Sequence, residues 1–229
     1  MKLALFGHGA MGRLVEERAR AEGHEVALVV TAQSADAATR LRGLDAAIDF
    51  SVAGAVLDNV RACVLAGVPA VVGTTGWREQ EQAVRRLVEE HGGALVFGAN
   101  FSVGVNLFYR VVARAAELCA GFDAYAPFVE EAHHARKRDA PSGTALKLRD
   151  LLAAEYEREI PVSSTRAGHI PGTHRVGFDS AADQILLTHT ARSREGFAAG
   201  ALVAAHWIQG RRGVYEFGQV IEEMLKERA

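Results

Sequence analysis

The sequence predicts an α/β protein with a Rossmann-like, doubly wound parallel sheet and a second α+β domain with a mixed sheet. In the first half, short apolar runs alternate with helix-spaced apolar residues, which is typical of parallel sheets covered on both faces. A glycine-rich turn follows the first of these runs. After Asn100 the rhythm changes, because three strand-like segments follow one another without an intervening helix.

The first half contains five strand-like runs separated by helical patterns. We predict strands at 3–6, 25–30, 46–50, 68–72 and 94–97, and helices at 11–22, 56–67 and 79–91. Gly23 and Gly67 mark the ends of two helices, as glycine commonly does. Because ligands of doubly wound sheets bind at the carboxyl ends of the strands, the segments after these runs are the candidate cofactor contacts.

The second half begins with a long apolar helix over 103–118. A strand over 124–131, a polar loop over 132–142 and an amphipathic helix over 145–157 follow. The remaining elements are strands at 163–167, 174–178 and 184–189 and helices at 197–208 and 217–226. Strands that cluster in this way predict a mixed or antiparallel sheet.

Composition excludes several classes of protein. The 229 residues include 26 Lys or Arg and 28 Asp or Glu, and a net charge of −2 argues against a dedicated nucleic-acid binder. The longest apolar stretch, over 197–208, is shorter than the ~20 residues of a membrane helix. Cys63 and Cys119 are too few for a disulfide framework, and no signal peptide is recognisable. We therefore expect a cytoplasmic protein without nucleic-acid or membrane partners.

A dinucleotide-binding turn is predicted between the first strand and the first helix. The turn reads Gly7-His8-Gly9-Ala10-Met11-Gly12, in the strand–turn–helix context that the function requires. Gly7 permits the tight turn, Gly9 lets a pyrophosphate approach the backbone, and Gly12 lets helix and strand pack closely. Unpaired N–H groups at the helix N-terminus favour the anion. The alternative is an ordinary glycine-rich turn.

The choice between NADH and NADPH stays open. An acidic residue that binds the ribose is expected about 20 residues after the turn. At the end of the second strand, however, no Asp or Glu precedes Asp36 and no Arg or Lys precedes Arg40. Thr31, Gln33 and Ser34 could hydrogen-bond either ribose. We therefore expect dual use of the two cofactors.

The segment 130–144 concentrates groups suited to an anionic substrate. Five of the six residues 133–138 are basic. His133 titrates near neutral pH and suits proton transfer, and Lys137 supplies a compact cation with a transferable proton. The alternatives are a solvated basic loop, a metal site and a nucleic-acid patch. Adjacent histidines rarely converge on one ion and no aromatic residue interleaves the charges, so we predict neither a metal nor a nucleic-acid site.

A helix N-terminus directly after the basic residues is predicted to bind a carboxylate. Pro141 fits the first turn of this helix, with Asp139 or Ser142 as its cap. The N–H groups of Gly143 and Thr144 would then face the anion. Cations, amide donors and a proton donor beside a nicotinamide site make reduction of a polycarboxylate plausible.

The segment 133–145 resembles the signature of the 4-hydroxy-tetrahydrodipicolinate (dihydrodipicolinate) reductase family, an enzyme family of lysine and diaminopimelate biosynthesis. The matching positions are His133-His134-x-x-Lys137-x-Asp139-Ala140-Pro141-Ser142-Gly143-Thr144-Ala145. Other stretches that resemble the family, in order along essentially the whole chain, are 7–12, Asp49-Phe50-Ser51, Gly73-Thr74-Thr75-Gly76, 99–106, 166–168 and Phe197-Ala198-x-Gly200-Ala201.

The resemblance implies an NAD(P)H-dependent reductase that converts (2S,4S)-4-hydroxy-2,3,4,5-tetrahydrodipicolinate to tetrahydrodipicolinate with loss of water. Hydride would add at ring carbon 4 of the dehydrated imine, and the ring nitrogen would then be protonated. His133 would be the proton donor and acceptor and Lys137 the proton donor, while His134, Gly143 and Thr144 would hold the substrate carboxylates. The implied cofactor contacts are Gly7, His8, Gly9, Ala10, Met11, Gly12, Gly73, Thr74, Thr75, Gly98, Ala99, Asn100 and Phe101.

The resemblance also implies a homotetramer of two-domain subunits. Residues 1–103 with 195–229 would bind the dinucleotide, and 104–194 would bind substrate and mediate oligomerisation. The chain departs from the family at three places: it lacks the acid after the second strand, its segment 31–45 is shorter than in many members, and His169 stands where an acid is common. Two other functions stay open, another nicotinamide-dependent amino-acid or amine dehydrogenase and a non-enzymatic dinucleotide sensor, but neither needs the segment 133–144 as written.

Overall fold

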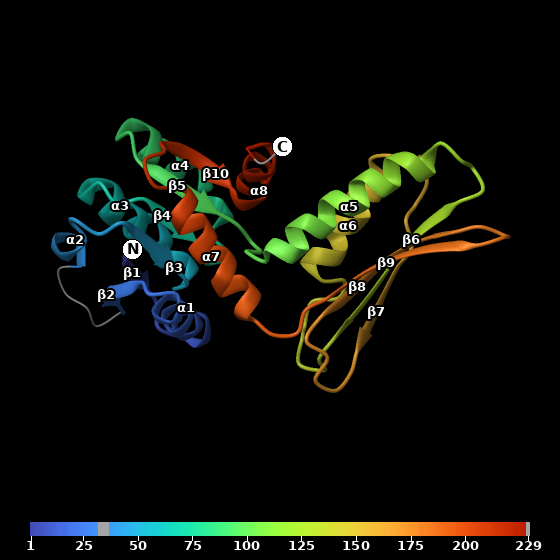
Figure 1. Cartoon of the computed structure of the whole chain (residues 1–229), viewed down its shortest axis with the longest axis horizontal. Coiled ribbons are helices and arrows are strands. Elements are labelled where there is room, and N and C mark those ends of the chain that lie inside the picture. The colour runs from blue at the N-terminus through green and yellow to red at the C-terminus, as the bar shows by residue number, and fades with distance from the viewer. Residues whose placement is uncertain (32–36, 228–229) are drawn as a thin grey trace. The chain divides into compact units, whose positions relative to one another are not determined.

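The computed structural model describes residues 1–31 and 37–227, which divide into two units (Figure 1). The first unit comprises Met1–Val103 and Arg194–Ala229, and the second comprises Gly104–Ser193. Gln33 and Ser34, two of the predicted ribose contacts, lie outside the described residues, as does Asp36. None of the described helices combines the length and the hydrophobicity that a membrane span requires.

The first unit is built on six parallel strands in the order β10-β5-β4-β3-β1-β2. The strands are β1 (Lys2–Phe6), β2 (Glu25–Val30), β3 (Ala46–Asp49), β4 (Ala70–Val72), β5 (Ala94–Phe97) and β10 (Gly213–Glu216). From β1 the chain runs to β2 on one side and then crosses to β3 on the other. This reversal is the switch point at which doubly wound sheets bind ligands, and the predicted Rossmann-like sheet is confirmed.

Helices cover both faces of this sheet (Figure 1). They are α1 (Ala10–Ala21), α7 (Glu195–Trp207) and α8 (Phe217–Lys226) on one face and α3 (Val56–Ala66) and α4 (Glu81–Glu90) on the other, with a short α2 (Ala37–Arg40). The alternation along β1 explains this arrangement. Leu3 and Leu5 pack toward α1, α7 and α8, whereas Ala4 and Phe6 pack toward α3 and α4.

The second unit holds a mixed sheet in the order β7-β6-β8-β9. Its elements are α5 (Val103–Ala120), β6 (Ala126–His133), α6 (Gly143–Ala153), β7 (Val162–Arg166), β8 (Thr173–Asp179) and β9 (Gln184–Thr190). The strand β6 is parallel to β7 and antiparallel to β8. Both helices lie on one face of the sheet (Figure 1), where Val112 and Leu148 pack with Val129 and Phe178. The predicted mixed sheet is confirmed.

Several predicted details are wrong. The strand β10, which pairs with β5, is not among the predicted elements, because its four residues begin with a glycine and form no apolar run. The strand over 124–131 extends to His133, so the predicted loop over 132–142 begins only at His134. The helix predicted to start at 145 begins at Gly143.

Gly200 generates a prediction about packing in the first unit. A Cβ at position 200 would overlap the carbonyl oxygen of Phe101, which is backbone and cannot swing aside. We expect Gly200→Ala to lower the free energy of unfolding by on the order of 3 kcal/mol, measured by urea denaturation. Gly196→Ala in the same helix is the control, because the nearest atom to its Cβ, Oγ of Ser102, is 3.7 Å away. Equal stability of the two variants would contradict the prediction.

Candidate active site

The glycine-rich turn connects β1 to α1 at the switch point of the sheet. Gly7 has a φ of +86°, which favours glycine, and its Cα lies against the backbone of Phe50 after β3. A Cβ at Gly12 would overlap the carbonyl oxygen of Gly7. Gly9 differs, because it is the extended N-cap of α1 and a Cβ there would meet no atom within 4 Å. The turn is therefore packed at Gly7 and Gly12 and open at Gly9.

The other predicted residues of the turn differ in their surroundings. Nε2 of His8 lies 2.6 Å from a carboxylate oxygen of Glu16 in α1. Hydrogen bonds from Arg20 and then from His8 lower the pKa of Glu16. Ala10 is exposed and Met11 is half-buried. The imidazole of His8 is thus held by the first helix.

The two other predicted cofactor segments follow neighbouring strands. Residues 73–75 follow β4 and residues 98–101 follow β5. Because all strands of this sheet are parallel, both segments share an edge with the glycine turn. Thr75 and Ala99 are exposed at this edge, and Gly98 and Asn100 are half-buried. A Cβ at Gly73 would overlap the ring of Phe50.

Two predicted cofactor residues use their side chains within the fold. The buried hydroxyl of Thr74 donates a hydrogen bond to Oδ1 of Asp49 at 2.8 Å. Asp49 also accepts hydrogen bonds from Ser51 and Asn59, so it ties the ends of β3 and β4 together. The side chain of Phe101 is 1% exposed and belongs to the core of the first unit. Only the backbone of these two residues is left for a ligand, and their assignment stays a prediction.

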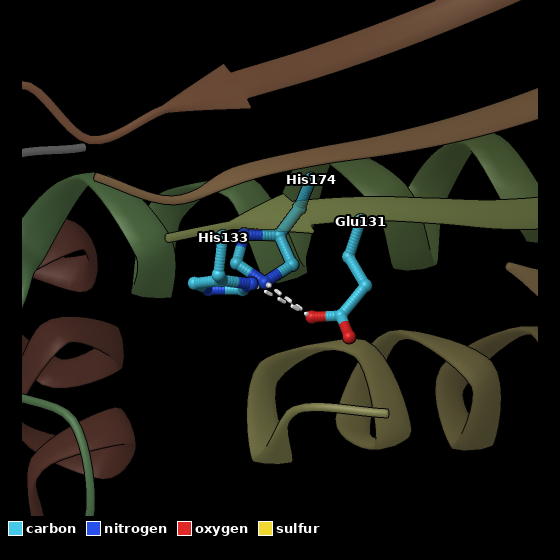
Figure 2. A group of neighbouring side chains, drawn as sticks. All are labelled: Glu131, His133 and His174. Atoms are coloured by element: carbon cyan, nitrogen blue, oxygen red, sulfur yellow. Dashed lines mark ion pairs between the residues drawn. The ribbon is translucent and has the colours of Figure 1, made fainter. Parts of the chain in front are cut away.

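In the second unit, the alternation along β6 brings Val129, Glu131 and His133 to one face. Val129, Glu131 and His133 are buried, whereas the residues between them are half-buried. In the sheet register, Glu131 lies opposite His174 of β8 and His133 lies opposite Arg166 of β7. Figure 2 shows the result, in which two imidazoles from different strands face one carboxylate oxygen.

The carboxylate of Glu131 is the centre of this cluster. Its Oε1 accepts hydrogen bonds from the backbone N–H of Ser142 at 3.0 Å, from Oγ of Ser164 at 2.7 Å and from Arg166 at 2.6 Å. Its Oε2 lies 3.1 Å from Nδ1 of His133 and 3.7 Å from Nε2 of His174. Burial alone would raise the pKa of Glu131, but the donors outweigh it and lower the pKa to about 2. The carboxylate is therefore ionised at neutral pH.

The surroundings of His133 and His174 lower the pKa of both imidazoles. Burial lowers the pKa of His133, the charge of Glu131 opposes this effect, and the charges of Lys137 and Arg166 reinforce it. Burial, and then the neighbouring His133, lower the pKa of His174 to about 4. At neutral pH both rings are mainly uncharged, so His133 is able to accept or, once charged, return a proton.

Lys137 lies in the loop after β6, close enough to His133 for its charge to affect that ring. Its Nζ lies 2.8 Å from Oδ1 of Asp139, and this hydrogen bond lowers the pKa of Asp139. The neighbouring His134 is half-buried, and its Nδ1 has no hydrogen-bond partner in the described part of the chain. Cationic and neutral donors therefore gather in this loop.

The N-terminus of α6 adjoins the same cluster. Oγ of Ser142 accepts a hydrogen bond from the N–H of Ala145 at 3.2 Å, so Ser142 and not Asp139 is the cap. Pro141 precedes the cap, and its predicted place in the first helical turn is wrong. The N–H groups of Gly143 and Thr144 have no acceptor within the helix, and Gly143 is exposed. The end of α6 is thus suited to an anion.

Three residues of the cluster are absent from the predicted catalytic and binding residues: Glu131, Arg166 and His174. The sequence could have indicated Glu131, because residues two apart in a strand share a face and Glu131 precedes His133 by two. Arg166 lies in the stretch 166–168 that resembles the family, but its contact with the cluster, like that of His174, depends on strand pairing, which no local pattern indicates.

The donor atoms of Glu131, His133 and His174 lie within 4.8 Å of one another, a spacing that metal ions use. Arg166 already supplies a positive charge to the same carboxylate. This favours an imidazole–carboxylate network over a cation site. The expectation of no metal stays a prediction.

Comparison with known proteins gives two family models that together span most of the chain. The model described as "Dihydrodipicolinate reductase, N-terminus" matches residues 1–101, and the model described as "Dihydrodipicolinate reductase, C-terminus" matches residues 104–221. The 4-hydroxy-tetrahydrodipicolinate reductase of Christiangramia forsetii is 34% identical over 99% of this chain and 100% of its own length. The enzyme of the same name from Methanoculleus marisnigri is 40% identical over 80% of this chain and 77% of its own.

Solved structures show the same fold. Dipicolinate-bound dihydrodipicolinate reductase from Paenisporosarcina sp. TG-14 has a TM-score of 0.78 at 20% identity, covering 94% of this chain and 97% of the other. An amine dehydrogenase from Mycobacterium smegmatis has a TM-score of 0.62 at 11% identity, covering 95% of each chain. At such identities the likeness concerns the fold alone.

The buried His174 generates a prediction about acid stability. A histidine whose pKa falls on folding from 6.5 to about 4 stabilises the folded state above pH 6.5, and this contribution is lost as the pH falls toward 4. Between pH 7 and pH 4, the free energy of unfolding of the wild-type protein should therefore fall by roughly 3 kcal/mol more than that of His174→Gln, as measured by urea denaturation. His169→Gln, at an exposed position of the same unit, is the control and should follow the wild type. Parallel pH curves for wild type and His174→Gln would refute this role of His174.

Proposed function

This chain belongs to the dihydrodipicolinate reductase family, and we propose that it reduces (2S,4S)-4-hydroxy-2,3,4,5-tetrahydrodipicolinate to tetrahydrodipicolinate with loss of water, using NADH or NADPH. The observation that carries the proposal is the combination of His133, Lys137 and the N-terminus of α6 in a chain whose other unit holds a dinucleotide turn. An amine dehydrogenase or a dinucleotide sensor has no need of this combination.

The residues at the switch point fit a nicotinamide dinucleotide. The N-terminus of α1 offers N–H groups to a pyrophosphate, and the space beside Gly9 is free of protein atoms within 4 Å of a Cβ. The exposed residues Thr75 and Ala99 share this edge of the sheet. When bound, the nicotinamide supplies a hydride to the substrate ring.

We assign the two carboxylates of the substrate to donors in the second unit. The N–H groups of Gly143 and Thr144 at the start of α6 would bind one carboxylate, with His134 as a further donor. The hydroxyl of Thr144 is hydrogen-bonded to Tyr109, which fixes its side chain. A relative of the same fold is described as dipicolinate-bound, and dipicolinate is likewise a cyclic dicarboxylate.

Lys137 and His133 would handle the proton. As hydride adds to carbon 4 of the dehydrated imine, electron density moves through the ring toward the nitrogen. Lys137 or the protonated form of His133 would deliver one proton to this anion, and that proton finally rests on carbon 5, which restores the C=N bond of tetrahydrodipicolinate. Fixed cations and amide donors stabilise negative charge that develops in the transition state. Asp139, at 2.8 Å, would hold Lys137 in place between turnovers.

We further propose that the first unit binds the cofactor, and that the second binds substrate and forms a homotetramer in the cytoplasm, as part of lysine and diaminopimelate biosynthesis. The edge strand β9 supports the assembly, because Ile185 and Leu186 are 43% and 46% exposed there and edge strands are usually covered.

An assay of turnover with the dicarboxylate and either cofactor tests the function and the expected dual use. We expect kcat/KM values for NADH and NADPH within about a hundredfold of each other, because the predicted ribose contacts include neither an acid nor a base. A larger preference in either direction would contradict dual use. Absence of turnover with both cofactors would contradict the function.

Replacement of Lys137 by alanine should lower kcat by on the order of 10²–10⁴, the usual loss for an acid–base group. His133→Ala should lose turnover to a similar degree. Lys147→Ala, at an exposed position of α6, is the matched control and should keep wild-type turnover. Activity of Lys137→Ala within threefold of the wild type would reject the role of Lys137.

Gly9→Val should weaken cofactor binding at least about tenfold without unfolding the protein, because the new side chain fills space that protein atoms leave empty. Fluorescence titration with NADH measures the affinity. Urea denaturation checks the stability, and the free energy of unfolding should stay within about 1 kcal/mol of the wild-type value. Gly121→Val in the second unit, whose Cβ would also lack close neighbours, is the control. Unchanged NADH affinity of Gly9→Val would count against the cofactor site.

A further inference from the structure

One oxygen of the Glu131 carboxylate is left without a hydrogen bond in the interior. Oε1 accepts three hydrogen bonds, whereas Oε2 is buried and has no hydrogen-bond partner among the residues that the structure describes. Its nearest possible donor is Nδ1 of His133 at 3.1 Å, which is likewise buried and unpartnered. An ionised oxygen without a donor is costly in the interior, so these two atoms are expected to share a proton.

The other imidazole is less suited to donate to Oε2. Nε2 of His174 lies 3.7 Å from Oε2 but 3.2 Å from Oγ of Ser142. Because that oxygen already accepts from the N–H of Ala145, its own proton is free for Nε2 of His174. His133 is then the donor that remains for the carboxylate.

The contact between His133 and Glu131 is close but is not aligned as a hydrogen bond. Such contacts in catalytic sites often tighten only when ligands bind. A neutral imidazole carries one proton, so a proton on Nδ1 leaves the lone pair on Nε2.

Gly172 keeps space beside Nε2. A Cβ at position 172 would lie 3.2 Å from Nε2 of His133, and the φ of +140° there also disfavours other residues. The nitrogen opposite the carboxylate therefore faces a position that carries no side chain.

We propose that Glu131 is a positioning residue, whose Oε2 holds His133 in the form protonated on Nδ1 and so presents Nε2 for proton exchange with the substrate. This inference rests on the proposed function, in which His133 moves the proton. The carboxylate also raises the pKa of His133 against the effects of burial, Lys137 and Arg166. The charged or titratable groups that face the ring are Glu131, Lys137, Asp139, Arg166 and His174.

Nuclear magnetic resonance of the ¹⁵N-labelled full chain, without ligands, tests the proposal directly. The signals of His133 are assigned by comparison with His133→Gln, and the ¹⁵N shifts report which nitrogen carries the proton. We expect the Nδ1-protonated form in the wild type and a lower pKa of His133 in Glu131→Gln. Glu130→Gln is the matched control, because Glu130 is adjacent on β6, faces away from the cluster and pairs with the exposed Arg175. It should change neither property.

Kinetics supply a second measurement. Glu131→Gln should lower kcat at least about tenfold while KM changes little, and the limb of the pH profile that belongs to His133 should move to lower pH. A wild-type His133 protonated mainly on Nε2 would overturn the proposal, as would equal pKa values of His133 in the two glutamine variants. A metal ion bound to Nδ1 of His133, detected by its effect on the ¹⁵N shifts, would also overturn it.

The proposed function and the positioning of His133 by Glu131 can be refuted independently. If Glu131→Gln does not fold, the protonation state of wild-type His133 decides alone. If the wild type shows no turnover but His133 is protonated on Nδ1, the proposed function fails while the positioning by Glu131 stands.

Discussion

The carboxylate of Glu131 lies in the interior of the second unit, where an ionised group is stable only if several donors surround it. Those donors come from β7, in Ser164 and Arg166, and from the cap of α6, in Ser142. The charge therefore fixes the start of α6 relative to the sheet, and with it both ends of the basic loop after His133. The amides proposed to bind an anion and the proposed acid–base residues owe their common location to this group.

The first unit also contains a buried carboxylate that accepts several hydrogen bonds. Asp49, buried at the end of β3, accepts hydrogen bonds from Ser51, Asn59 and Thr74 and so joins the segments after β3 and β4. In both units a buried acid at or near the end of a strand organises the loops where ligands are expected. This explains why Thr74, a residue of the predicted cofactor segment, has its hydroxyl directed into the protein.

Local patterns in the sequence were sufficient for most elements and insufficient for the contacts between them. The bounds of β2, β5 and α8 follow from apolar periodicity, and the context of the glycine turn follows from the same patterns. The partners of Glu131 lie 33 and 35 residues away on β7, and their positions depend on strand register. Strand β10 cannot be predicted from local patterns because it is short and lacks an apolar run, and its place depends on pairing with β5.

The three glycines of the turn meet two different requirements, close packing of the protein at Gly7 and Gly12 and open space at Gly9. Substitutions at Gly7 and Gly12 collide with the backbone of the protein itself, so selection at these positions acts on folding. Position 9 has no such neighbours, and a library of variants there would sample nucleotide affinities on an intact scaffold. Cofactor affinity in this protein can therefore be altered at a position where a new side chain does not collide with the protein itself.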